Sequence, residues 1–172
     1  MKASLRSVSR TSSRPAPRLP VSLLAASLAL ATTAALTPSA RAAAIDESVP
    51  TSDVLTQLEQ RASQASPREQ AWLYTELVHS MTEKAGKELS DGDDNAAQAT
   101  LKQINHYAHL IQASLARNTS KLKNAEMLMQ HTTFRLAQYM HLASGDDRAE
   151  MQATLKQLDQ VNDALLTQVF KH

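Results

Sequence analysis

The sequence of 172 residues contains no cysteine, and it is poor in glycine (three residues), phenylalanine (two) and tryptophan (one). Without cysteine the chain can form neither a disulfide scaffold nor a thiolate metal site, and it has no cysteine nucleophile. The scarcity of glycine and of large aromatic residues, beside abundant Ala, Leu, Gln, Lys and Glu, favours helices over sheets. Stability must therefore come from the packing of helices.

The first 44 residues have the organisation of a secretory signal peptide. Residues 1–20 carry five basic residues and no acid, residues 21–36 form an apolar stretch, and residues 39–44 supply small residues for a cleavage site. The apolar stretch is short for a membrane span, which needs ~20 apolar residues. We predict a leader over residues 1–44 that is cleaved, and a periplasmic or secreted protein with no stable membrane insertion afterwards. An uncleaved N-terminal anchor and an organellar transit peptide are the alternatives.

Cleavage would reverse the sign of the net charge. The leader holds six of the 18 Lys and Arg residues and none of the 17 acidic residues, which leaves 12 basic against 17 acidic residues and a net charge of −5. An acidic domain argues against nucleic acid and anionic membranes as partners.

One segment of the chain occurs twice. Gly-Asp-Asp at residues 92–94 is followed by Gln-Ala-Thr-Leu-Lys-Gln at 98–103, and the same two runs return at 145–147 and 152–157. Such repetition indicates that one supersecondary unit is present in two copies. We place repeat 1 at about 66–117 and repeat 2 at about 119–172.

Capping signals and apolar periodicity predict an all-α fold. Ser66-Pro67-Arg68-Glu69 is a capping box at the start of the first long helix. Projection at ~100° per residue gives each predicted helix one apolar face. The long helices are expected over about 67–89, 94–117, 121–143 and 147–170, and a shorter one over about 53–64. Two repeated αα-hairpins would then form an up-down four-helix bundle over 66–172, preceded by a short helix and linker over 45–65.

Two histidine motifs are candidates for metal binding. Glu76 and His79 have the Glu-x-x-His spacing of di-iron carboxylate bundles. The projection places both with Glu83 on the face opposite Leu77, which predicts a solvated face and only small effects of substitution. His106 and His109 are close enough to share one metal, but they too project away from the core, and a structural zinc site needs about four ligands.

The turn at Asp91–Asn95 resembles the start of an EF-hand loop. It lacks the glycine at the sixth loop position, which is Ala96, and the acidic residue at the twelfth, which is Lys102. A turn followed by a helix cap is predicted instead. No metal or cofactor is therefore expected, and a transition metal or haem is kept as the alternative.

The third long helix carries a second stripe opposite its core face, formed by Met127, His131, Phe134, Gln138 and His141. A helix with one buried face has no need of Met and Phe there. The helix over 53–64 could cover this stripe, the stripe could be a seam for a protein partner or a second copy, or its Met and His residues could line a soft-metal or haem pocket.

Three runs, Leu73–Val78, Lys123–Met129 and Gln152–Asp159, resemble a family of small secreted bacterial α-helical proteins to which no function is assigned. The resemblance covers most of the chain after the leader and implies no activity, cofactor or partner. The plan is also similar to that of periplasmic helical-hairpin metal sensors and chaperones. Their Leu-Thr-x-x-Gln signature is half met by Leu55–Glu59, where Glu59 replaces the Gln.

No serine-histidine-acid set, phosphate loop or pair of inward carboxylates stands out, so we expect no enzymatic activity. The predicted function is that of an exported helical-bundle protein that acts through association with a protein partner or with itself. Met127, His131, Phe134 and His141 are the candidate binding residues. The alternative is a periplasmic four-helix bundle that binds a metal or haem.

Overall fold

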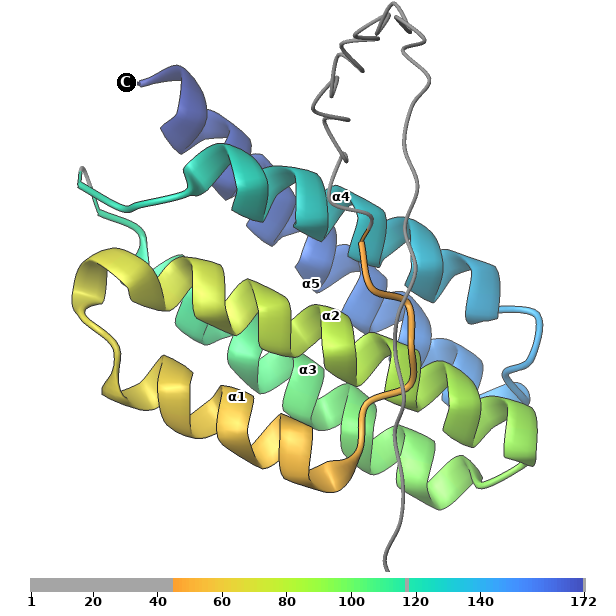
Figure 1. The fold of residues 1–172 in the computed structure, drawn as a ribbon. Helices are drawn as coiled ribbons and strands as arrows, with labels where there is room; N and C mark the ends of the chain where they lie inside the picture. Colours follow the sequence, from red (N-terminus) through yellow and green to blue (C-terminus); the bar gives the residue numbers. More distant parts are fainter. Residues whose placement is uncertain (1–44, 117, 172) are drawn as a thin grey trace, which may run out of the picture. The chain divides into compact units, whose positions relative to one another are not determined.

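The computed structural model describes residues 45–116 and 118–171, and these residues form five α-helices and no strand (Figure 1). The helices are α1 (Ser52–Gln64), α2 (Pro67–Asp91), α3 (Asp94–Ser114), α4 (Leu122–Tyr139) and α5 (Gly145–Phe170). The predicted helical class is confirmed. The predicted leader lies outside the described residues. Within the described part, no helix is long and apolar enough to cross a membrane.

The turn between α2 and α3 is built as the sequence predicted. Gly92 adopts the left-handed conformation (φ 76°), and its N–H donates to the carbonyl of Leu89. Only glycine takes this conformation without strain, which is why it so often ends a helix. The Asp93 side chain then caps α3 by accepting from the N–H of Ala96 at 3.1 Å. A turn and a cap therefore account for the EF-hand-like residues.

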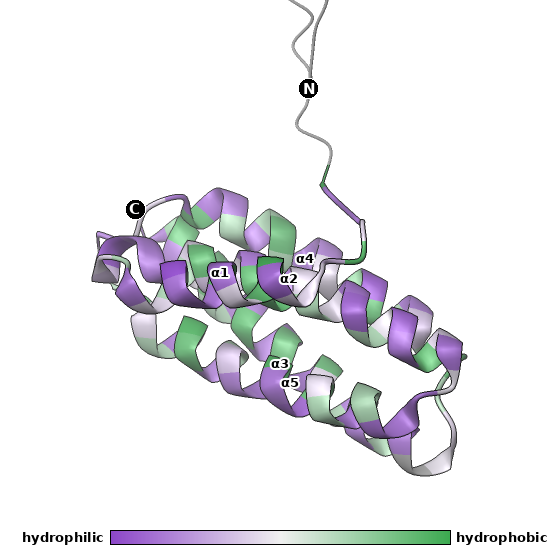
Figure 2. Ribbon diagram, turned by 60° about the horizontal axis from the view of Figure 1, so that its bottom comes forward, coloured by the Kyte–Doolittle hydropathy of each residue, from purple (hydrophilic) through white to green (hydrophobic). Residues whose placement is uncertain are grey.

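The helices lie in two layers. Figures 1 and 2 show α1, α2 and α4 side by side, with α3 and α5 beneath them. In agreement with the views, α2 packs against α1, α3 and α4, whereas α5 packs against α3 and α4. The core lies between the layers, and Leu77 of α2, Leu101 of α3, Met129 of α4 and Leu158 of α5 are fully buried.

Helices α2 and α4 pack beside each other in parallel. Along α2 and α4, His79 meets Thr132 and Glu83 meets Arg135, so the two helices run in the same direction. A simple up-down bundle would instead place α5 beside α2. The predicted order of neighbours therefore differs from the observed contacts. The connection between α3 and α4 spans about seven residues and can reach ~23 Å. Because of this reach, α4 need not pack against α3, although it follows α3 in the chain.

The predicted solvated face of α2 is wrong. His79 is only 5% exposed and Glu83 only 2%, while Glu76 is half-buried. The projection assumed one buried face, but α2 is the middle helix of its layer and has neighbours on three sides. The alternative that residues 53–64 cover the α4 stripe is also wrong, because α1 packs against α2 and makes no such contact with α4.

Gly86 allows Tyr139 of α4 to lie directly against α2. A Cβ atom placed on Gly86 would come within 2.4 Å of the Tyr139 ring. Glycine inside a helix normally costs about 0.5–1 kcal/mol relative to alanine. Its presence here is explained by the space that the aromatic ring needs.

Gly86→Ala is expected to destabilise the protein by about 1–3 kcal/mol, as overpacking usually does. Gly145→Ala is the matched control, because a Cβ atom there would meet nothing within 4 Å, and it should change stability by about 0.5 kcal/mol or less. Urea unfolding followed by circular dichroism measures both. Stabilisation by Gly86→Ala would show that the ring does not occupy this space.

Candidate functional site

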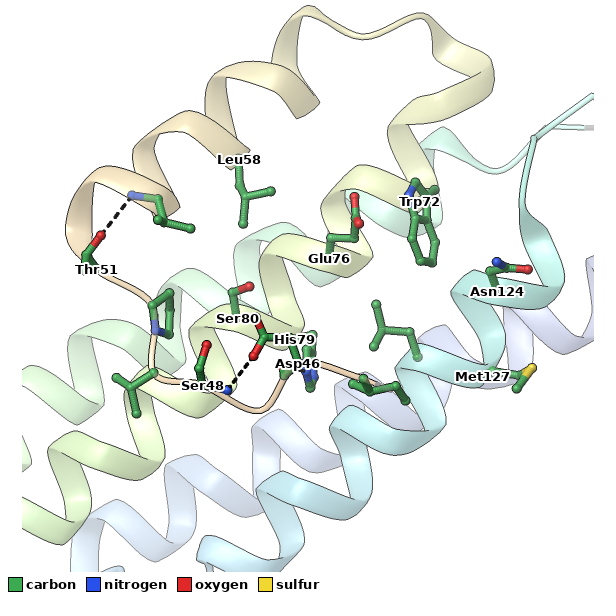
Figure 3. A pocket seen from close by; sticks show the side chains of 15 residues that line it. Asp46, Ser48, Thr51, Leu58, Trp72, Glu76, His79, Ser80, Asn124 and Met127 are labelled. Carbon is green, nitrogen blue, oxygen red and sulfur yellow. Dashed lines mark hydrogen bonds between the residues drawn. The ribbon is translucent and has the colours of Figure 1, made fainter. Parts of the chain in front are cut away.

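A cavity of about 870 Å³ opens between α1, α2, α4 and the segment of residues 45–51 (Figure 3). The segment crosses α2 on its way from α4 to the start of α1, as Figure 1 shows. The cavity wall is mainly apolar, with Ile45, Val49, Val54, Leu58, Met127 and Leu128. Its polar side chains include Glu76, His79 and Ser80 of α2 and Asn124 of α4.

His79 holds the crossing segment to the helices. Its Nε2 lies 2.9 Å from the carbonyl oxygen of Asp46, and its Nδ1 lies 3.1 Å from the hydroxyl of Thr132. Since a carbonyl can only accept, Nε2 carries the proton. The Thr132 hydroxyl beside Nδ1 donates its one proton to the carbonyl of Leu128 at 2.7 Å, so a bond to Nδ1 would have to share that proton. Burial lowers the pKa of His79, and the hydrogen bond to Asp46 opposes this only in part. Nε2 therefore holds the Asp46 carbonyl, and Nδ1 lies against the Thr132 hydroxyl.

A second attachment joins the segment to α4 through Glu47. One carboxylate oxygen lies 3.1 Å from Nε2 of His131, and the other lies 3.7 Å from Nη1 of Arg135. The His131 nitrogen is close enough for an ion pair, but it is not aligned for a hydrogen bond. The two histidine rings lie near each other, with 5.6 Å between the centroids of His79 and His131.

The Glu83 carboxylate of α2 is fully partnered by α4. Arg135 donates to it from Nε at 2.9 Å and from Nη2 at 2.8 Å, and the Tyr139 hydroxyl also donates to it. Burial alone would raise the pKa of Glu83, but the bonds from Arg135 and Tyr139 outweigh burial and hold the pKa below its usual value of 4.5. Burial and the contact with Glu83 raise the pKa of Tyr139 to about 12. The Glu83 carboxylate is therefore ionised and fixed by three hydrogen bonds, which suits a structural role.

Glu76 has the opposite environment. Its Oε2 atom is buried and has no hydrogen-bond partner. Burial raises the pKa of Glu76 above its usual value of 4.5, and the charges of Arg61 and Lys121 offset this only in part. In Figure 3 the carboxylate lies between Leu58 of α1 and Trp72 of α2. In the sequence, Glu76 stands out only as half of a Glu-x-x-His metal motif. Trp72, four residues earlier on the same helix, is the neighbour that could have indicated a shared cavity.

The other predicted site residues are scattered. On α4, Met127 is 54% exposed and borders the cavity, and Phe134 is 60% exposed. His141 is exposed in the turn that follows α4. His131 is partly covered because of Glu47. The stripe is therefore interrupted at its second residue.

The remaining metal candidates are not brought together. His106 and His109 are exposed on α3, a helix that contributes nothing to the cavity wall. Within residues 45–116 and 118–171, no group of three or more His, Asp and Glu side chains is placed to hold a metal ion.

Comparison of the chain with models of protein families, with curated proteins and with solved structures gives no match. The function must therefore be argued from the cavity and its surroundings.

Proposed function

We propose that the protein is a non-enzymatic binding protein that holds a small, mainly apolar molecule in the cavity beneath residues 45–51. The single observation that carries this proposal is a cavity of about 870 Å³ with apolar walls and one buried, unpartnered carboxylate oxygen. Sites of this kind, ~300–1,000 Å³ with few polar groups, are typical for small ligands.

The polar groups at the cavity support binding rather than chemistry. The His79 ring lies between the Asp46 carbonyl and the Thr132 hydroxyl, so a bond from either nitrogen to a ligand would displace one of these contacts. Glu83 lies outside the cavity lining and is held ionised by Arg135 and Tyr139. Two carboxylates line the cavity. Asp46 accepts a hydrogen bond from the N–H of Ser48 at 3.0 Å, whereas Glu76 keeps a buried oxygen without a partner among the described residues, which suits the recognition of a ligand. No observation favours the metal or haem alternative.

The proposal includes the setting predicted from the sequence. The chain would be exported after cleavage within residues 42–45, and its four long helices would descend from one duplicated αα-hairpin. Equivalent threonines of the two repeats, Thr100 and Thr154, are both buried, which supports duplication.

Trp72 borders the cavity and is the one tryptophan of the whole chain, so its fluorescence reports on binding directly. We expect 1-octanol to change the Trp72 emission of the full chain saturably. At ~0.8 kcal/mol per buried CH₂, its seven methylenes give about 5–6 kcal/mol, or a dissociation constant on the order of 0.1 mM.

Ser80→Phe should fill part of the cavity and weaken octanol binding about tenfold, or about 1.4 kcal/mol. Ser90→Phe adds the same ring at an exposed position of α2 and is the matched control. An emission that never saturates in the unaltered chain, or equal binding by both variants, would refute the proposed site.

A second candidate function is self-association through α4. The observation that favours it is the exposure of two large apolar side chains on this helix, Met127 at 54% and Phe134 at 60%. Such side chains on one face are typical of an interface with another protein molecule.

If α4 forms this interface, Phe134→Ala should weaken dimerisation by about 2 kcal/mol, the usual cost of removing an aromatic anchor. The helical signal should be unchanged. Gln130→Ala, also at an exposed position of α4, is the control. Sedimentation equilibrium over a range of concentrations measures the effect. A chain that stays monomeric at every concentration would eliminate this candidate.

A further inference from the structure

The buried face of α2 contains one polar group that the chain leaves without a partner. Glu83 receives bonds from Arg135 and Tyr139, and both ring nitrogens of His79 lie against polar groups of the chain. Within α2, Glu76 alone presents a buried oxygen, Oε2, that accepts no hydrogen bond among the described residues. A carboxylate with a buried oxygen and no donor is costly, so a positively charged ligand group beside Glu76 would be favoured.

The nearest cations of the chain do not supply that donor. Arg61 and Lys121 act on Glu76 through their charge, but in the described part of the chain neither forms an ion pair or a hydrogen bond with it. Lys121 is instead placed over the Trp72 ring, with 5.1 Å from its Nζ to the ring centroid. The place beside the Glu76 carboxylate is therefore open to a cation from outside.

Trp72 and Glu76 are one helical turn apart on α2 and both line the cavity (Figure 3). An electron-rich ring beside a carboxylate is a combination that suits an ammonium group, because both attract positive charge. The contact with Lys121 shows that a cation can lie over this ring. An anionic head group would instead meet the negative charge of Glu76.

Resting on the proposed function, we infer that the cavity binds a primary alkylamine or a similar cationic amphiphile, with its ammonium group on Glu76 beside Trp72. Its apolar chain lies along Val54, Leu58 and Leu128. The ammonium group lies beside the Glu76 carboxylate, and its charge adds to those of Arg61 and Lys121, neither of which pairs with Glu76 in the described part of the chain.

Three probes of equal chain length separate the head group from the apolar chain: n-octylamine, 1-octanol and octanoate, each titrated into the full chain and followed by Trp72 fluorescence. A hydrogen bond to a charged group contributes enough for octylamine to bind about tenfold more tightly than octanol. Octanoate is expected to bind most weakly. In Glu76→Gln the preference for octylamine should be lost while octanol binding is kept, because glutamine has the same shape without the charge.

Glu126→Gln is the matched control, since it removes one carboxylate from α4 outside the cavity lining and should keep the tenfold preference. Equal binding of the three probes, tighter binding of octanoate, or an unchanged preference in Glu76→Gln would overturn the inference and leave the cavity proposal standing. Failure of all three probes to bind would overturn both.

Discussion

The pairing of Glu83 with Arg135 and Tyr139 fixes how α2 lies against α4. Breaking a buried pair by removing one partner typically costs ~3–5 kcal/mol, so a carboxylate that is 2% exposed could not stay there alone. Gly86 provides the space that Tyr139 needs to reach it. Because this contact sets the two helices side by side in parallel, the face of α2 that looks solvated on a helical wheel becomes an interior face. The crossing of residues 45–51 and the cavity beneath them depend on this arrangement.

The same face of α2 shows two ways of burying a glutamate. Seven residues apart, Glu83 is surrounded by donors and keeps a lowered pKa, while Glu76 has none at Oε2 and its pKa is raised by burial. The difference is not one of depth, because Glu83 is the more buried of the two. An acid that is left without a partner at an apolar cavity needs an explanation, and the proposed ligand would supply one.

The positions of the helices could be predicted from the sequence, but which helices pack against one another could not. Local signals place the turn at Gly92 and the cap at Asp93. The apolar periodicity within each helix identifies core residues such as Leu77, Leu101 and Leu158. Both kinds of signal depend on nearby residues alone. Which helix lies beside α2 depends instead on the long connection after α3 and on the contact of Glu83 with Arg135, 52 residues apart. The cavity depends on four separate segments, so no single helix projection could show it.

The central claim is that Glu76 and Glu83 occupy opposite electrostatic environments on one buried helix face. Titration of the carboxyl carbons by NMR, with both residues assigned in the same ¹³C spectrum of the folded protein, measures this most directly. The account predicts that Glu76 titrates above 4.5, the ordinary value for glutamate, and that Glu83 titrates below it. A Glu76 that titrates at or below 4.5 would mean that its carboxylate already has a partner or is solvated, and the proposed binding site would lose its basis.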